Sequence, residues 1–419
     1  MWGSRLNPSV RWVHLVLLGA VTIFVGAMWG LERTVVPLIA KNEFGIASAT
    51  VTLSFIFGFG LTKCFANLVG GGLMDRIGRR GVLVVGWVVG LPVPLLIIWA
   101  PAWEWVVAAN LLLGVNQGLC WTATILMMMD RMGPQRRGLS VGLNEFAGYS
   151  GVAIATLATG FVAGAFAPRP HPFLFGTGVA VVGLLLSAFL VQETGRHVRD
   201  EATEGQARHR PPSFRGALIA SLRNRSLLSC SQGGLVTKIN DAAIWGLLPL
   251  FLAAQGLGVA RISVVAAIYP AAWGITQLFT GSLSDRVGRK PLIVLGMLVQ
   301  SLGMSLVAVG IDFSLWIGGV VVLGLGTALV YPTLIAAVGD YAHPLRRASS
   351  VGIYRWYRDA GFMVGALLAG AVADLLGFRA TFFLIGGISL LSALVVWLLM
   401  QTPAVARGGT RRPAEREST

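Results

Sequence analysis

The sequence predicts an all-α polytopic membrane protein, with twelve transmembrane helices in two pseudo-symmetric six-helix bundles. Hydrophobic residues make up 55% of the 419 positions and charged residues only 12%, whereas an average soluble domain has about 25% charged residues. The mean hydropathy is +0.73. In addition, one eleven-residue stretch occurs twice, at 71–81 and 281–291, which indicates an internal duplication.

A helix that crosses the hydrocarbon core needs about 20 mostly apolar residues. Twelve runs satisfy this requirement: 12–39, 47–73, 82–100, 104–129, 138–166, 173–192, 227–254, 261–283, 291–310, 314–338, 349–376 and 379–401. The first run is too long for the apolar region of a cleavable signal peptide and has no convincing small-residue cleavage site. We therefore interpret it as the first transmembrane helix.

The duplication is supported by several pairs of residues at one offset. The repeated stretch reads G-x-L-x-D-R-x-G-R-[RK], and its two aspartates, Asp75 and Asp285, are 210 positions apart. Asp130 and Asp340 share this offset, as do Ser140-Val-Gly and Ser350-Val-Gly. The predicted organisation is a first bundle at 1–192, a cytoplasmic linker at 193–226, a second bundle at 227–402 and a cytoplasmic tail at 403–419.

The repeated loop resembles the signature of the major facilitator superfamily, which joins helices 2 and 3 and, in weaker form, helices 8 and 9. The resemblance covers roughly residues 10–402 and implies a twelve-helix secondary transporter that moves a small solute by alternating access. In that superfamily the first loop resembles a latch on the cytoplasmic side. The resemblance therefore implies two gating charge clusters, made of Asp75, Arg76, Arg79 and Asp130, and of Asp285, Arg286, Arg289 and Asp340.

The net charge of +15 does not indicate a nucleic-acid partner, because the basic residues are concentrated in alternate loops. Those loops contain Arg76, Arg79 and Arg80, then Arg131, Arg136 and Arg137, then the linker, and the loops between them are nearly free of Lys and Arg. By the positive-inside rule the Arg-rich loops and both termini are cytoplasmic. We expect a monomer in a bacterial inner membrane. Within the linker, a short amphipathic helix around 214–222 and a flexible tether are both compatible with the sequence.

We select nine ionisable residues that lie well inside the predicted spans, away from their ends, where each charge costs at least ~2.5 kcal/mol and is a functional candidate by default. The acids are Glu32, Glu145, Asp241 and Asp359, and the bases are Arg33, Lys63, Lys238, Arg355 and Arg358. This near balance predicts salt-bridged partners around a substrate and proton cavity between the halves. Further cavity candidates are Asn116, Gln117, Trp121, Tyr149, Asn240 and Tyr331.

Several of these residues also have a simpler interpretation. Glu32 and Arg33 are adjacent and fit a fixed pair near the outer surface as well as a transport site. Lys63, Arg355 and Arg358 fit clamps at the inner ends of helices, and the polar and aromatic candidates fit interior packing.

Lys238 and Asp241, at positions i and i+3, are expected to pair on one helix face. For the proton site we rank Glu145 first, Asp241 second and Glu32 third. A partly dry cavity favours the protonated form of a carboxyl group, as proton coupling requires.

The sequence gives no indication of catalysis. Cys64, Cys120 and Cys230 have no metal-ligand spacing and fit small core residues. There is no nucleotide-binding G-x-x-x-x-G-K-[ST] loop, and no nucleophile or metal constellation stands out. We therefore expect no enzyme activity, no metal and no cofactor, and a transporter driven by the proton gradient.

Export of a drug-like molecule, metabolite or toxic inorganic compound in antiport with protons is the favoured function. Two departures weaken a standard drug-antiporter mechanism: such proteins usually have an Arg where this chain has Gly114, and residues 151–160 lack the Pro and two glycines of their helix 5 motif. Proton-coupled uptake of a small, anionic solute is the alternative. A non-transporting membrane sensor is less favoured, because no segment is large enough for a signalling domain.

Overall fold

The computed structural model describes residues 8–133, 136–194, 214–342 and 347–401, and every regular element in these ranges is a helix. The first half contains α1 (Pro8–Gly30), α2 (Val35–Asn42), α3 (Ala49–Thr52), α4 (Ser54–Ile77), α5 (Arg79–Gly90), α6 (Pro92–Ile98), α7 (Trp103–Met132), α8 (Arg137–Ala165), α9 (His171–Leu185) and the π-helix η2 (Leu186–Leu190). The second contains α11 (Phe214–Arg223), α12 (Arg225–Ala254), α13 (Val259–Val287), α14 (Arg289–Val309), α15 (Phe313–Tyr341) and α16 (Arg347–Leu399).

The described chain crosses a membrane twelve times, as the hydropathy pattern predicts. Eleven of its helical stretches are long and apolar enough to span a bilayer. The longest lies in α16, whose 53 residues would extend about 80 Å as one straight helix, far more than the ~30 Å hydrocarbon core. Gly377, with φ of 83°, interrupts α16 and divides it into two crossings.

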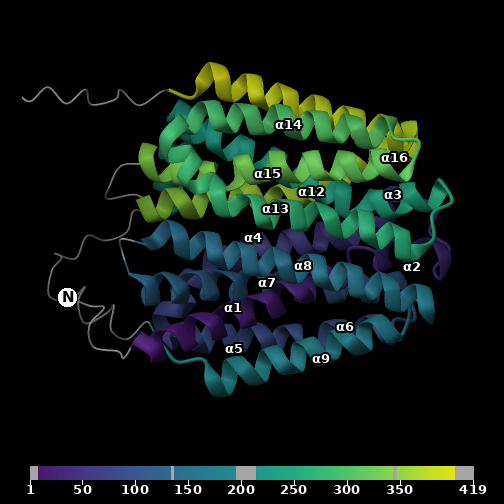
Figure 1. Cartoon of the computed structure of the whole chain (residues 1–419), viewed down its shortest axis with the longest axis horizontal. Helices are drawn as coiled ribbons and strands as arrows, with labels where there is room; N and C mark the ends of the chain where they lie inside the picture. Colours follow the sequence, from purple (N-terminus) through teal and green to yellow (C-terminus); the bar gives the residue numbers. More distant parts are fainter. Residues whose placement is uncertain (1–7, 134–135, 195–213, 343–346, 402–419) are drawn as a thin grey trace, which may run out of the picture.

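Figure 1 shows the helices of the first half, coloured purple to teal, beside those of the second half, coloured green to yellow. Between the halves, α8 packs on α13 and α4 packs on α16. Of the linker predicted at 193–226, residues 195–213 lie outside the described part, as does the tail at 403–419. The short helix that was one alternative for this linker is present as α11.

The first membrane helix is interrupted, which the sequence analysis did not foresee. Helix α1 ends at Gly30, and α2 begins at Val35 after a four-residue turn. Glu32, Arg33 and Thr34 lie in this turn and are at most 2% exposed. Non-helical backbone at membrane depth is tolerated only where protein covers it or it lines a cavity, and broken helices are frequent at transporter binding sites.

Close packing against α8 holds α1 in place next to this break. A Cβ at Gly30 would lie 2.4 Å from the carbonyl oxygen of Val152, and one at Gly151 would lie 2.0 Å from the carbonyl oxygen of Ile23. Both distances are too short for a side chain, so glycine is required for this backbone contact. The turn after Gly30 is thereby positioned against the interior of the bundle.

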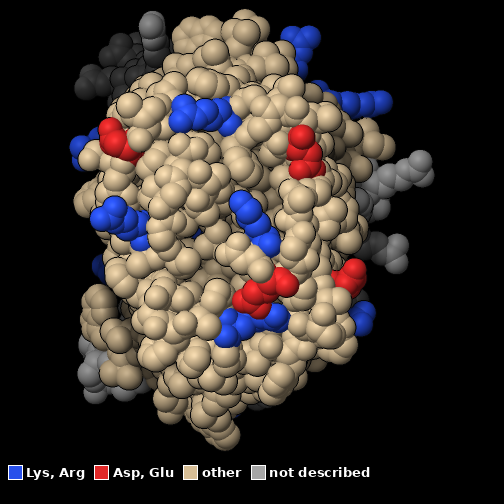
Figure 2. Space-filling view, turned by 90° about the vertical axis from the view of Figure 1, so that its right-hand side faces the viewer, with Lys and Arg blue, Asp and Glu red and all other residues tan. Residues whose placement is uncertain are grey.

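The bundle has two ends, which we call the basic face and the opposite face. The basic face is the end where α4 and α13 finish and α5 and α14 begin, at the left in Figure 1. The opposite face is seen directly in Figure 2, where scattered charged side chains of both signs lie on a surface without a wide opening.

One carboxylate joins the two halves at the opposite face. Asp374 of α16 accepts hydrogen bonds from the Ser48 hydroxyl (2.8 Å) and from the backbone N–H groups of Ala49 (2.6 Å) and Thr50 (3.0 Å). These groups form the N-terminal end of α3, where unpaired N–H groups favour a negative charge. Asp374 thus caps a helix of the other half and holds this face closed.

We expect Asp374→Ala to open the opposite face more often. In a protein whose native cysteines are replaced, a reporter at Thr52→Cys, a position 1% exposed, should react with a membrane-impermeant maleimide several-fold faster when Asp374 is removed. Three hydrogen bonds to one carboxylate are lost together, which explains the direction of the effect.

Asp312→Ala is the matched control. Asp312 also caps a helix, α15, by accepting from the Leu315 N–H at 2.9 Å, but its contact stays within the second half. An equal acceleration in both variants would show that Asp374 does not act between the halves.

Candidate functional site

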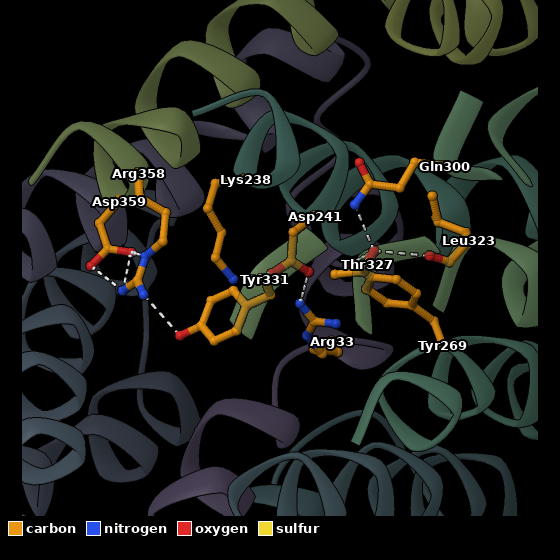
Figure 3. Close-up of polar contacts among 10 residues, drawn as sticks. All are labelled: Arg33, Lys238, Asp241, Tyr269, Gln300, Leu323, Thr327, Tyr331, Arg358 and Asp359. Atoms are coloured by element: carbon orange, nitrogen blue, oxygen red, sulfur yellow. Dashed lines mark hydrogen bonds and ion pairs between the residues drawn. The ribbon is translucent and has the colours of Figure 1, made fainter. Parts of the chain in front are cut away.

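A buried ionic bridge connects the break in the first helix to the second half. Arg33 donates a hydrogen bond to Oδ1 of Asp241, and Nζ of Lys238 donates to Oδ2 of Asp241 at 3.0 Å (Figure 3). All three side chains are at most 2% exposed. The predicted Lys238–Asp241 pair is confirmed. The fixed Glu32–Arg33 pair, one of the two alternatives for these residues, is wrong because Arg33 extends to Asp241 instead.

A second polar group crosses the interface nearer the basic face. Arg358 makes a two-pronged contact with its neighbour Asp359, with N–O distances of 2.8 and 2.9 Å, and donates to the Tyr331 hydroxyl at 2.8 Å (Figure 3). Asn67 of α4 donates to Asp359, and Thr122 of α7 donates to Asn67 at 3.0 Å. Asp359 is therefore bonded from both halves.

Aromatic rings separate these two polar groups, with Trp29 at their centre. Its ring lies within 6.3 Å, centroid to centroid, of five others: Phe59, Trp121, Tyr149, Trp245 and Phe362. Three cations also approach the Trp29 ring: Arg33 and Lys63 at 4.6 Å and Lys238 at 5.5 Å. Such contacts stabilise a buried cation without neutralising it.

Two of the predicted carboxylates have no ion pair in the described part of the chain. Glu145 accepts from Trp121 Nε1 at 2.7 Å through one oxygen, while its Oε2 has no hydrogen-bond partner. Neither oxygen of Glu32 has a hydrogen bond of good geometry, and its neighbouring polar side chain is Asn110. Both are at most 2% exposed. A buried carboxyl group of this kind favours its neutral form.

These side chains enclose a small cavity between the halves, on the basic side of Trp29. Its lining residues are Trp29, Lys63, Asn67, Gln117, Trp121, Thr122, Tyr149, Lys238, Tyr331, Arg355 and Arg358. In this conformation the free space accommodates about one water molecule. A larger solute therefore requires the two halves to move apart.

The structure brings eight of the predicted cavity residues to this lining and places others elsewhere. Asn116 donates to the Gly86 carbonyl at 2.9 Å and faces α5. Asn240 joins a polar network inside the second half, donating to Gln300 at 3.1 Å and accepting from Ser389 at 3.0 Å. Glu32, Arg33, Glu145, Asp241 and Asp359 lie behind the lining. Trp29, Asn67 and Thr122 line the cavity although the sequence analysis did not select them.

The repeated loops form charge clusters at the basic face. Arg79 pairs with Asp130 and donates to the Leu126 carbonyl at 3.0 Å, and Asp75 lies within electrostatic reach of Arg79. In the second loop Arg289 pairs with Asp285 at 2.7 Å and with Asp340 at 2.9 Å. Arg76 and Arg286 are exposed. In the described residues each cluster pairs charges within one half.

The first loop has an additional carboxylate that the second lacks at the matching position. Glu193, just after η2, accepts from the backbone N–H groups of Arg79 (3.1 Å) and Arg80 (3.0 Å) and so caps α5. Gly78 makes room for it: a Cβ at Gly78 would lie 2.4 Å from Glu193 Oε2. No sequence pattern flagged Glu193, because it lies more than 100 positions from the loop that it caps.

Comparing Gly78→Ala with Gly288→Ala separates backbone strain from this cap. Gly78 and Gly288 have φ of 83° and 97°, so alanine is strained in both, by roughly 1–2 kcal/mol. At Gly78 the new methyl group also displaces Glu193. At Gly288 a Cβ would have no atom within 3.7 Å. We expect the lower melting temperature for Gly78→Ala in purified protein. Equal melting temperatures would contradict the role of the Glu193 cap.

Comparisons with known proteins agree with this architecture over nearly the whole chain. A family model described as Major Facilitator Superfamily matches residues 18–237 and 230–418. The multidrug resistance protein MdtG of Salmonella paratyphi C is 24% identical over 412 residues, covering 94% of this chain and 95% of that protein. MdtG of Citrobacter koseri is 23% identical over 408 residues, covering 94% of each.

Two solved structures share the fold at lower sequence identity. The nucleoside transporter NupG superposes with a TM-score of 0.77 at 14% identity, covering 92% of this chain and 100% of that one. A bacterial homologue of the human lysosomal transporter Spinster, in an inward-facing and unoccupied conformation, superposes with a TM-score of 0.76 at 14% identity. The match covers 94% of this chain and 98% of that one. With the family model matched in both halves, the chain belongs to the Major Facilitator Superfamily, whose members are membrane transporters and not enzymes.

Proposed function

We propose that this protein exports a small solute across the cytoplasmic membrane by alternating access, in exchange for protons. The observation that carries the proposal is the small cavity between the halves, which is lined by cations and aromatic rings and has buried carboxyl groups behind this lining. In the proposed orientation the Arg-rich basic face is cytoplasmic. The carrier functions as a monomer, since the cavity is complete within one chain.

Export, rather than uptake, is supported by the relatives. The MdtG proteins are named for multidrug resistance, a property that outward transport of toxic compounds explains. The fold itself does not distinguish direction. The charge clusters of the repeated loops fit this proposal as latches that exchange partners when the basic face opens and closes.

We assign the transported proton to Glu145. Its Oε2 has no partner, and it lies within electrostatic reach of Arg355 and Arg358, so its ionisation changes the charge that the cavity presents. Glu32 is the second candidate because neither of its oxygens is well bonded. Asp241 now ranks third, since two cations contact it and stabilise its charged form.

Uptake of an anionic solute together with protons is the second candidate function. The specific observation in its favour is the lining of the cavity, in which Lys63, Lys238, Arg355 and Arg358 are the charged residues. A protein of the same fold is able to work in either direction. The ion gradient that drives the solute decides between the two.

The first experiment is a tolerance and accumulation screen in bacterial cells that lack their main efflux pumps. Cells carrying the protein, Glu145→Gln or an empty vector are compared across drugs, metabolites, metals and metalloid oxyanions. Export predicts that some compound is retained less with the intact protein. Higher retention would instead establish uptake.

Once the solute is known, Glu145→Gln tests the coupling of transport to protons in proteoliposomes. We expect pH-driven accumulation to fall to the level of passive equilibration, a loss of about tenfold per pH unit if one proton is coupled. Exchange of labelled solute at equal pH should persist, because glutamine keeps the size of the side chain. Glu104→Gln, an exposed acid on the opposite face, is the matched control.

Two outcomes would overturn this assignment. Accumulation that is insensitive to a pH gradient in the unmodified protein would exclude proton coupling. Coupling that survives in Glu145→Gln but is lost in Glu32→Gln would move the proton site to the broken helix.

A further inference from the structure

We propose that the transported solute is an organic anion with a planar apolar part, whose acidic group binds between Lys63 and Arg355. This inference rests on the proposed function in one respect, that the cavity between the halves is the transport site. It goes beyond that function by assigning the chemical class of the solute. It does not depend on the direction of transport or on proton coupling.

The charge of the cavity is the first argument. Among its lining residues in the described chain, four are basic and none is acidic. Asp241 is shared between Lys238 and Arg33, and Asp359 pairs with Arg358. Lys63 and Arg355 have no ion pair within the described residues, so their two charges face the cavity without a carboxylate bonded to either.

Lys63 lies among aromatic rings and is not bonded to a carboxylate in the described residues. Its side chain is 6% exposed, and its Nζ lies 4.6, 5.0 and 5.4 Å from the ring centroids of Trp29, Phe59 and Phe362. The rings stabilise an ammonium group through their quadrupoles but carry no compensating charge. An anion bound beside Lys63 would stabilise its ammonium form, because an isolated buried charge is otherwise costly.

Unused hydrogen-bond donors point to the same ligand. Within the lining, Arg355 Nε and Trp29 Nε1 are buried donors without an acceptor, whereas Gln117 Oε1 is the corresponding acceptor without a donor. Buried polar groups in native proteins are normally paired. An acidic group supplies two or three acceptor oxygens and so satisfies donors that the chain itself leaves unpaired.

The binding groups come from both halves of the molecule. Lys63 is on α4 of the first half, whereas Lys238, Arg355 and Arg358 are on α12 and α16 of the second. Without a ligand these cations repel one another across the interface. An anion placed between them replaces this repulsion with attraction, and thus favours the arrangement in which the halves are close together.

The apolar part of the solute is assigned from the remaining walls. Trp121, Tyr149 and Tyr331 line the cavity together with Trp29, and their rings contact one another directly or through Trp273. Aromatic side chains bind flat apolar groups by stacking and edge contacts. The cavity therefore selects an amphipathic acid over a small inorganic anion.

The charge of the solute also determines how the membrane potential acts on it. An organic anion that leaves the cell carries its negative charge outward, which an inside-negative potential favours by ~2.3 kcal/mol per charge and 100 mV.

Three probes of one ring system and nearly equal size test the proposed class: 2-naphthoate, 2-naphthalenemethanol and 2-naphthylmethylammonium. Their binding to the purified full chain is measured by calorimetry and by quenching of tryptophan fluorescence. We expect the anion to bind at least about tenfold more tightly than the alcohol, as one charge-assisted hydrogen bond predicts, and the ammonium compound to bind most weakly.

Variants of Lys63 and Arg355 locate the preference. Lys63→Met and Arg355→Gln should each reduce the anion-to-alcohol ratio by about tenfold, while Lys63→Arg should retain most of it. Lys41→Met removes an exposed lysine of α2 and should leave the ratio unchanged. Because the alcohol reports on the folded cavity in every variant, loss of folding is distinguished from loss of charge recognition.

The proposal is overturned if the alcohol or the ammonium compound binds as tightly as the anion. It is also overturned if the anion does not bind at millimolar concentration, or if Lys63→Met leaves the ratio unchanged. Transport in proteoliposomes separates this result from the proposed coupling. Uptake of 2-naphthoate that follows an imposed potential but not a pH gradient would support the anion and contradict proton exchange. Proton-driven export of a cation would support proton exchange and contradict the proposed anionic solute.

Discussion

The contact between Arg33 and Asp241 is the constraint on which the rest of the site depends. Two opposite charges lie at most 2% exposed in the middle of the bundle, and each would be costly alone. Arg33 reaches Asp241 because it lies in the turn that interrupts the first helix. Lys238 adds a second cation to the same carboxylate.

Around this bridge three further sets of contacts join the two halves. At the opposite face Asp374 caps α3 across the interface, and below it the rings around Trp29 fill the space between the halves. Nearer the basic face Asn67 and Asp359 connect α4 with α16. Transport requires these contacts to break and re-form as the halves move. Polar contacts suit this task, because separated partners are able to bind water or solute instead.

The fold was predictable because its signals are local or periodic. Apolar runs give the twelve crossings, and the 210-residue offset gives the two halves. Lys238–Asp241 was predictable because i, i+3 neighbours share a helix face. Sequence patterns could not predict the Arg33–Asp241 pair or the caps formed by Glu193 and Asp374, because each of these contacts joins residues more than 100 positions apart. The break after Gly30 also escaped prediction, although the polar run Glu32-Arg33-Thr34 and Pro37 follow at that place.

The most direct test of this account is a distance measurement between spin labels at Lys41 and Arg261, exposed positions of the two halves. Removing one partner of a buried ion pair costs about 3–5 kcal/mol. Arg33→Gln and Asp241→Asn should therefore each shift the distance distribution away from the closed arrangement. The charge-swapped double variant Arg33→Asp with Asp241→Arg should return it toward the closed distance. A distribution that is unchanged in both single variants would contradict the claim that this ion pair holds the halves together.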